Sequence, residues 1–373
     1  MRDILRLYRG LRGMLTTHYP NFALGMPLGP TETPIFIYHD VTSEEFGADL
    51  QFLRRNGYRT LSLREFFERA DGKGKPEKAV LITFDDARKT FYTEALPALR
   101  AFGARATLFA PTYWMMGEAN SPETSRHDLF MSWMELRRAL DSGLVDVQSH
   151  GSRHALVCVS NKLLGFATPA MLNRFDIYDW PMRHQGGGDV LGRPLLGTPV
   201  YDSSPLLSAS NRYIESTAAT HACVEMVARE GGDRFFSQKG WSQALRSIYE
   251  RALGREPGRQ LPKADFRSLV ASEFEQSRDE FRRHLGYEPD TMAYPWKLGS
   301  PLSLELAARF GLKAVFGVAL DYRRARSKRL PVRVFGRLKC DWLPTLPGDG
   351  RLGLTTVAAR KLCGFSKTLH LAH

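Results

Sequence analysis

Two clusters of polar residues follow short apolar runs, and their residue types suit metal-assisted hydrolysis. Asp85 and Asp86 come directly after the apolar run Ala79–Phe84. His150 and His154 follow a second apolar run, and two histidines four residues apart on one helical turn face the same way and can share a metal ion. One aspartate and two histidines leave an open position on a divalent metal, and the second aspartate can accept a proton from water. This combination predicts a metal-dependent hydrolase.

The predicted elements around these clusters place them at one edge of a sheet. The runs at Ala79–Phe84, Leu144–Val147 and Thr291–Ala293 are short and apolar, as buried strands are, and helical patterns separate them. Strands that alternate with helices of this length predict βαβ units and a parallel sheet. The carboxyl ends of parallel strands are where α/β folds carry their reactive groups. A third cluster, Tyr294–Trp296, follows the third strand at the same edge.

A stretch of different composition interrupts the α/β pattern. It is rich in glycine, proline and serine and carries two separate helical patterns, so we predict a large insertion at residues 155–263. The insertion divides an α/β barrel into two parts, residues 34–154 and 264–345. Residues 1–33 are a basic N-terminal helix and lead, and residues 346–373 are a C-terminal tail. Because barrel enzymes commonly carry such insertions beside the active site, we expect this one to shape the choice of substrate, and its deletion to spare metal binding.

Charge and composition exclude several classes of protein. The chain has 373 residues, with 52 Lys and Arg against 40 Asp and Glu, which gives a formal charge of +12. It carries no zinc-finger, basic-zipper or aromatic RNA-binding signature, so we expect no nucleic-acid partner. We interpret the densest basic run, at 323–329, as a solvated loop. No apolar run is long enough to span a membrane.

Cysteine spacing and the first residues favour a cytoplasmic protein. The four cysteines are scattered, which is typical of reduced thiols rather than a disulfide framework. Arginines interrupt the apolar residues of segment 1–15, whereas a secretory signal needs an uninterrupted apolar core. The segment is a short basic amphipathic helix, either packed on the domain surface or in peripheral contact with an anionic inner membrane face.

The three clusters, in this order, resemble the motifs of the polysaccharide deacetylases, the NodB-homology or family 4 carbohydrate esterases. Thr83–Asp86 is similar to the first motif, His150–His154 to the second and Met292–Pro295 to the third. The third motif reads Ala-Tyr-Pro-Trp, as in one subset of the family. The resemblance covers about Thr33–His154 and Phe266–Val334. It implies a distorted, TIM-like (β/α)7 barrel with a large insertion.

The resemblance also implies a role for each matching residue. Asp85 is the expected general base, and Asp86, His150 and His154 are the expected metal ligands. The backbone N–H of Tyr294 is the expected donor to the developing oxyanion. The implied activity is a metal-dependent N-deacetylase, a hydrolase that removes an acetyl or similar acyl group from an amino sugar in a polysaccharide, lipid-linked saccharide or glycoconjugate. Zn²⁺ is the first expectation for the metal, and Co²⁺, Ni²⁺ or Mn²⁺ suit the same ligands.

The sequence departs from the family pattern around the base. The arginine that usually orients the base is replaced by Thr291. Arg333 is our candidate for that task, and a surface arginine at a strand edge is the alternative interpretation. Lys297, which stands where relatives commonly have glycine, Trp296 and Asp341 are further candidates for contact with the substrate or the base.

The proton donor to the leaving amine stays open at this point. His184 and the C-terminal His373 are candidates, and so is His39. The missing arginine and the unassigned acid leave an alternative function, a catalytically impaired member of the same fold that binds a carbohydrate or a partner. The retained base and metal ligands argue for the enzyme.

Overall fold

The structure is a computed structural model that describes residues 22, 26–29, 32–115, 129–185, 187–317, 332–353 and 356–357. The predicted N-terminal helix, the basic run at 323–329, Cys363 and His373 lie outside the described residues.

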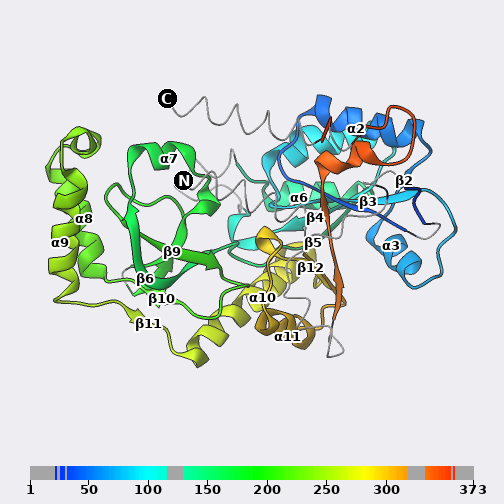
Figure 1. Cartoon of the computed structure of the whole chain (residues 1–373). Coiled ribbons are helices and arrows are strands. Elements are labelled where there is room, and N and C mark those ends of the chain that lie inside the picture. Colours follow the sequence, from blue (N-terminus) through cyan, green and yellow to red (C-terminus); the bar gives the residue numbers. More distant parts are fainter. Residues whose placement is uncertain are drawn as a thin grey trace.

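A curled parallel sheet forms the larger part of the molecule (Figure 1). In spatial order its strands are β14 (Arg333–Phe335), β13 (Ala314–Phe316), β12 (Thr291–Ala293), β5 (Val145–Ser149), β4 (Ala106–Ala110), β3 (Ala79–Phe84), β1 (Ile35–Tyr38) and β15 (Leu338–Lys339). A short strand, β2 (Arg59–Thr60), pairs with β3. The neighbouring strands of this sheet are parallel. The distorted (β/α) barrel expected from the sequence is therefore confirmed.

The two edges of this sheet meet through the chain itself. β14 and β15 are the outermost strands on opposite edges, yet only Gly336 and Arg337 lie between them in the sequence. Because two residues span only about 7 Å when fully extended, the sheet must curl until its edges lie side by side. Arg337 therefore lies on the seam of the barrel.

Helices cover the outer face of the sheet, and a smaller cluster fills its interior. The covering helices are α2 (Ser43–Arg55), α4 (Leu96–Phe102), α6 (Trp133–Asp141), α10 (Lys263–Leu285) and α11 (Pro301–Arg309). Alternate residues of β3 divide between the two sides. Val80 and Ile82 join the large cluster under these helices, whereas Ala79 and Leu81 join Phe109 and residues of other strands in a separate cluster. α3 (Leu63–Ala70) adds Leu63 and Phe66 to this inner cluster.

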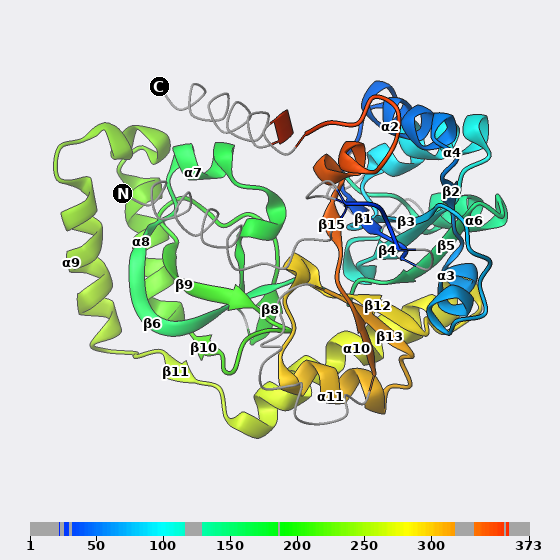
Figure 2. The same cartoon turned by 45° about the vertical axis from the view of Figure 1, so that its right-hand side comes forward.

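The segment predicted as an insertion forms a second lobe beside the barrel (Figures 1 and 2). Its sheet has the order β8 (Gly188–Val190), β7 (Pro181–Gln185), β6 (Leu156–Phe166) and β9 (Pro199–Pro205). Around it lie α7 (Pro169–Arg174), α8 (Thr217–Arg229), α9 (Trp241–Leu253) and the small ladder of β10 (Tyr213–Ile214) with β11 (Arg259–Gln260). The two long helices agree with the sequence-based expectation. The four-stranded sheet was not predicted: β7, β8 and β9 are short or rich in polar residues, and polar residues interrupt the apolar residues of β6.

The second lobe packs in two ways. Its outer part has a core of its own, which includes Tyr201, Cys223 and Leu245. Its inner part, including Val157 and Tyr178, belongs to the large cluster that it shares with the barrel. The lobe is therefore continuous with the barrel at the site described below.

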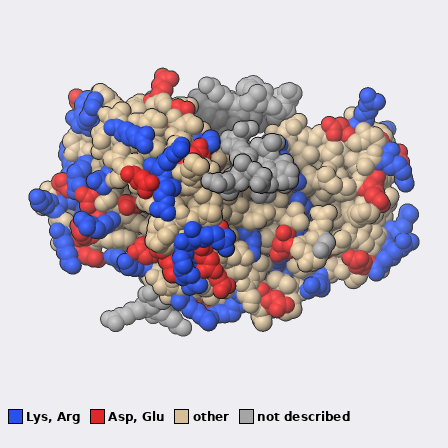
Figure 3. Space-filling view, turned by 180° about the vertical axis from the view of Figure 1, so that it is seen from behind, with Lys and Arg blue, Asp and Glu red and all other residues tan. Residues whose placement is uncertain are grey.

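The distribution of surface charge and the character of the helices concern two of the partners considered above, nucleic acid and a membrane. On the face seen from behind, Lys and Arg side chains are interspersed with Asp and Glu (Figure 3). Among the described residues, no helix combines the length and the apolar character needed to cross a membrane.

Candidate active site

Asp86, His150 and His154 converge at the carboxyl edge of the barrel sheet. Asp86 follows β3, and both histidines follow β5. Asp86 Oδ1 lies 3.4 Å from His150 Nε2 and 3.3 Å from His154 Nε2, and all three side chains are buried. Asp86 Oδ1 has no hydrogen-bond partner among the described residues. A buried carboxylate oxygen without a donor, facing two imidazole nitrogens, fits a divalent cation.

The protonation of the three side chains suits metal binding. His150 Nδ1 lies 2.8 Å from the carbonyl oxygen of Ala293, which can only accept, so the hydrogen is on Nδ1 and Nε2 presents its lone pair. Burial, opposed by Asp86, lowers the pKa of His154 to about 3, so this imidazole is neutral. Burial raises the pKa of Asp86, but His154 and His150 outweigh it and hold that pKa below the ordinary value. The set is one carboxylate, one neutral imidazole at His154 and the imidazole of His150, whose Nε2 faces the carboxylate.

The loop that carries the two histidines is fixed by a buried glutamate. Glu273 on α10 is 2% exposed, and its Oε2 accepts hydrogen bonds from the backbone N–H groups of Ser152 (3.1 Å) and Arg153 (2.8 Å). Its Oε1 accepts from the Arg153 guanidinium at 2.7 Å. The expectation that the histidines share a helical turn is wrong. Gly151 (φ 79°) and His154 (φ 47°) have left-handed backbone, which ends any helix there.

Asp85 points into the barrel and is held by Arg337. The alternation of β3 places Asp85 on the same side as the interior residues Leu81 and Thr83. Arg337 Nη1 and Nη2 donate to Asp85 Oδ1 and Oδ2 at 2.6 and 2.8 Å, and the two side chains are 0% and 3% exposed. Burial raises the pKa of Asp85, but Arg337 and then His150 outweigh it, so the pKa lies below the ordinary value. The carboxylate is ionised and both of its oxygens are fixed.

Arg333, our candidate for this contact, lies elsewhere. It donates to Asp71 at 2.8 Å on the surface and is 39% exposed, with its guanidinium over the Phe67 ring. The reason is position, because Arg333 is the first residue of β14 and Arg337 lies beyond its carboxyl end. The sequence did contain a signal that favours Arg337, because the other candidate reactive residues also follow the carboxyl ends of their strands.

The N–H of Tyr294 is not available as an oxyanion donor in this structure. It donates to the carbonyl oxygen of Phe316 at 2.9 Å, as an extension of the β12–β13 ladder. The expectation for this group is therefore wrong for the observed conformation. Trp296, two residues after Tyr294 in the turn η6 (Pro295–Lys297), contacts the site through its ring, whose centroid is 4.2 Å from that of the His154 ring.

Lys297 is close enough to Asp85 for their charges to interact, whereas the charge of Asp341 acts on another group of residues. Burial, reinforced by the charges of Arg337 and Lys339 and opposed by that of Asp85, lowers the pKa of Lys297 to about 8. Asp341 is exposed in the turn η7 (Cys340–Thr345). Its charge acts on Tyr38, Asp49 and Cys340.

Of the two candidate proton donors that the structure describes, His39 and His184, His39 is the one whose charge acts on the site. It is exposed directly after β1, and its charge lowers the pKa values of both Asp85 and Asp86. His184 lies on β7 of the second lobe, where its ring is 3.3 Å from Asp189 Oδ1.

Backbone strain is concentrated at this site. Among the described residues, the non-glycine positions with positive φ are Asp86 (71°), Ala87 (46°), His154 (47°), Trp296 (51°) and Lys297 (63°). Residues other than glycine, asparagine and aspartate rarely adopt this conformation, which costs about 1 kcal/mol or more each. Such strain persists where the surrounding structure enforces it, commonly at functional sites.

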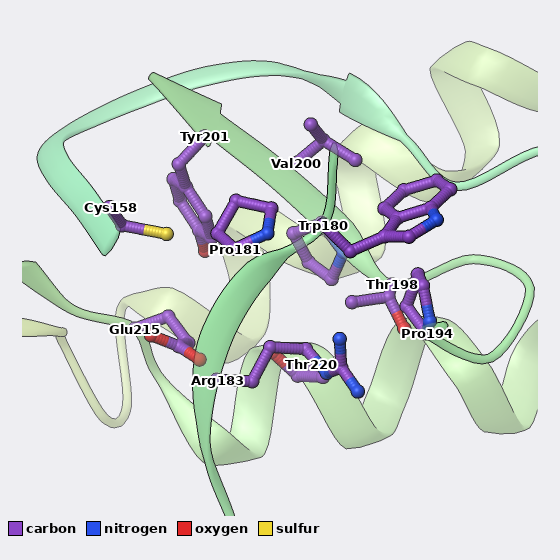
Figure 4. A pocket seen from close by; sticks show the side chains of 11 residues that line it. Cys158, Trp180, Pro181, Arg183, Pro194, Thr198, Val200, Tyr201, Glu215 and Thr220 are labelled. Carbon is purple, nitrogen blue, oxygen red and sulfur yellow. The ribbon is translucent and has the colours of Figure 1, made fainter. Parts of the chain in front are cut away.

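A separate cavity in the second lobe is too small for a sugar. Trp180, Arg183, Glu215 and Tyr201 are among its lining residues (Figure 4). Its space suits about one water molecule. Such a water can serve the buried Trp180 Nε1 and Glu215 Oε2, which have no partner among the described residues.

Comparisons with known proteins agree with this geometry. The family model for polysaccharide deacetylases matches residues 72–171, which contain Asp85, Asp86, His150 and His154. The poly-β-1,6-N-acetyl-D-glucosamine N-deacetylase of Escherichia coli is 35% identical over 105 residues, which cover 26% of this chain and 16% of that protein. The enzyme of the same name from Staphylococcus epidermidis is 33% identical over 114 residues, covering 30% of this chain and 37% of that protein.

The matched part spans well under half of these relatives. Among solved structures, the deacetylase domain of BpsB from Bordetella bronchiseptica has a similar fold, with a TM-score of 0.51 at 17% identity. That similarity covers 84% of this chain and 98% of the domain. Residues 72–171 are therefore similar in sequence to the polysaccharide deacetylases, and the chain is similar in fold to a solved deacetylase domain.

Proposed function

We propose that this protein is a metal-dependent N-deacetylase that hydrolyses the acetamido group of an amino sugar. One observation supports the proposal most strongly. Asp85, held by Arg337, lies with its Oδ2 3.6 Å from Nε2 of His150, directly beside the group of Asp86, His150 and His154. A fixed, ionised carboxylate next to three ligand groups is what the activation of water requires.

The chain's own residues divide the reaction between them. Asp86, His150 and His154 would hold one divalent metal, which when bound polarises the amide carbonyl and lowers the pKa of water. Asp85 accepts a proton from the attacking water as its oxygen bonds to the carbonyl carbon. The amine nitrogen takes a proton from His39 as the C–N bond breaks, and the free amine and acetic acid, which ionises to acetate, leave the site. Arg337 keeps Asp85 ionised and aligned.

The substrate class that we propose is an N-acetylated saccharide. The names of two relatives specify poly-β-1,6-N-acetyl-D-glucosamine, so oligomers of that polymer are the first compounds to test. Trp296 offers an aromatic ring beside His154 on which a sugar ring can pack. Lys297, with no ion-pair partner among the described residues, suits an anionic group of the substrate.

Three finer assignments belong to the same proposal. We take zinc as the metal because imidazole and carboxylate ligands suit it, with cobalt, nickel and manganese as alternatives. Cys158, Cys223 and Cys340 are free thiols, which favours a reducing, cytoplasmic setting. Peripheral contact with the inner membrane face rests on the basic segment 1–15. Failure to co-sediment with anionic liposomes counts against that contact.

The test combines metal content with acetate release. We expect about one divalent ion per wild-type chain by elemental analysis, and none in Asp86→Ala or His150→Ala. His184→Ala, in the second lobe, is the matched control and should retain the metal. The wild type should release acetate from N-acetylglucosamine oligomers, and Asp85→Asn should release it at least ~100-fold more slowly while keeping the metal. A wild type that binds no metal in metal-replete medium refutes the proposal.

The main argument for the alternative function, saccharide binding without turnover, no longer holds. It was suggested by the absence of the family's usual arginine, and Arg337 makes that contact with Asp85. Metal retention and oligosaccharide binding without acetate release would favour it.

A further inference from the structure

A turn of the second lobe reaches the candidate metal site. The turn η4 (Ile177–Asp179) carries Tyr178, which is 5% exposed. Its ring stacks on the His154 ring, with centroids 3.9 Å apart and an interplanar angle of 27°. Asp176 caps this turn, since its side chain accepts a hydrogen bond from the Tyr178 N–H at 3.2 Å. The segment predicted as an insertion thus supplies a side chain to the site.

A buried arginine ties this turn to the barrel. Arg88, three residues after Asp85, is 7% exposed and donates to Asp176 Oδ1 at 3.0 Å. Its guanidinium lies over the Tyr178 ring at 4.9 Å and the Phe130 ring at 5.0 Å. Its Nε is 3.8 Å from Oδ2 of Asp86. One cation therefore contacts the turn, the tyrosine and the aspartate of the metal group.

The two histidines of the metal group are held differently. A ligand histidine normally donates its second ring N–H to an oxygen, which fixes the ring, and His150 does so to Ala293. His154 Nδ1 is buried and has no such partner among the described residues. His154 also has a strained, left-handed backbone. Ring contacts, with Tyr178 at 3.9 Å and Trp296 at 4.2 Å, are what orient its imidazole.

We propose that Tyr178 is a positioning residue that holds His154 in its metal-binding orientation by ring stacking. The inference rests on the proposed function to the extent that His154 is a metal ligand. The ring, not the hydroxyl, performs this task, because the Tyr178 hydroxyl is buried without a partner among the described residues. The earlier expectation that the insertion can be deleted without loss of metal binding changes accordingly, since deletion removes Tyr178.

The test measures metal affinity in the full chain, with the ring removed or retained. Zn²⁺ affinity of the metal-free protein is measured by competition with a chelator, and the Co²⁺ form is examined by its visible absorption spectrum. We expect Tyr178→Leu to weaken affinity by about 10- to 100-fold, the range for groups that orient a ligand, and to alter the Co²⁺ spectrum. Tyr178→Phe, which retains the ring, should keep the wild-type Zn²⁺ affinity and Co²⁺ spectrum. Tyr249→Leu, in the separate core of the second lobe, is the matched control and should leave both unchanged.

A second variant covers the case in which Tyr178→Leu does not fold. Asp176 is 46% exposed, and Asp176→Ala keeps the ring but removes its cap and its tie to Arg88, so the spectrum should shift and the affinity should fall several-fold. Wild-type affinity and spectrum in both Tyr178→Leu and Asp176→Ala would overturn the inference, as would Tyr178→Phe as weak as Tyr178→Leu. If the wild type binds metal and Asp86→Ala does not, such a result leaves the proposed function standing. A wild type without metal defeats both.

Discussion

Replacing Arg337 with methionine tests the pairing on which the proposed base depends. The substitution keeps an unbranched side chain of similar reach but removes both donors to Asp85, 2.6 and 2.8 Å away. Asp85 is 3% exposed, so water cannot replace the lost partner without a rearrangement of the barrel seam. Removing one member of a buried ion pair costs about 3–5 kcal/mol, because the other charge stays desolvated and unpaired. We expect Arg337→Met to lower the free energy of unfolding by that amount near neutral pH.

The pH dependence of this loss has a definite sign. The pKa of Asp85 is lowered in the folded protein, so its contribution to stability is present above the unfolded pKa of about 4 and is lost as the pH falls. Arg337→Met removes a cause of that low pKa. The difference between wild type and variant should therefore be full at pH 7 and should shrink below about pH 4.

The assay is urea unfolding of metal-free protein, followed by circular dichroism. Arg333→Met is the matched control, since that arginine pairs with Asp71 while 39% exposed and such surface pairs contribute about 1 kcal/mol or less. Asp85→Asn combined with Arg337→Met should be less destabilised than the sum of the single variants by about 1–3 kcal/mol. Equal losses in Arg337→Met and Arg333→Met, or strictly additive single variants, would refute the reasoning.

Three further predictions follow from other contacts. Burial raises the pKa of Asp49 to about 6 despite its hydrogen bond from Tyr38. The contribution of Asp49 to stability is therefore full below about pH 4 and falls by on the order of 3 kcal/mol as the pH rises through 6. Asp49→Asn should abolish this difference between the free energies of unfolding measured in urea at pH 4 and pH 7. Glu273→Ala should cost about 3 kcal/mol and weaken Zn²⁺ binding, because it strands two buried N–H groups and Arg153; unchanged chelator competition would contradict the second half. Lys297→Met should raise KM for saccharides with a carboxylate or phosphate and leave KM for neutral ones unchanged; equal effects on both would exclude the proposed anion contact.

The clusters of polar residues at the strand ends could be predicted because sheet topology determines where they lie. Once three apolar runs are taken as parallel strands, the residues after each must meet at one edge, and the structure places Asp86 and His150 there. Local geometry was less accessible. The His150–His154 spacing suggested a helical turn, but a buried carboxylate from α10 captures the N–H groups that a helix would have used. That contact joins residues about 120 apart, which no local pattern reveals.

Two errors share a physical cause. Arg333 and Arg337 are equally plausible by residue type, and only closure of the barrel decides that the residue on the seam faces Asp85. In the same way, the Tyr294 N–H was a reasonable candidate for the oxyanion donor, but it donates to Phe316 of the neighbouring strand. Tyr178 was missed because no local pattern in the sequence around it indicates that its ring packs on His154.

The seam residue has a consequence for the order in which the site forms. The three metal-ligating candidates, with the residues Glu273 and Ala293 that hold the two histidines, all precede Arg337 in the chain, whereas Asp85 and Arg337 are 252 residues apart in sequence. Contacts across such a separation form late, because closing a long loop is entropically costly and slow. During synthesis or refolding, the chain can acquire its affinity for a metal ion before the base is aligned. Bound metal would then overstate the fraction of molecules able to turn over substrate in any incompletely folded preparation.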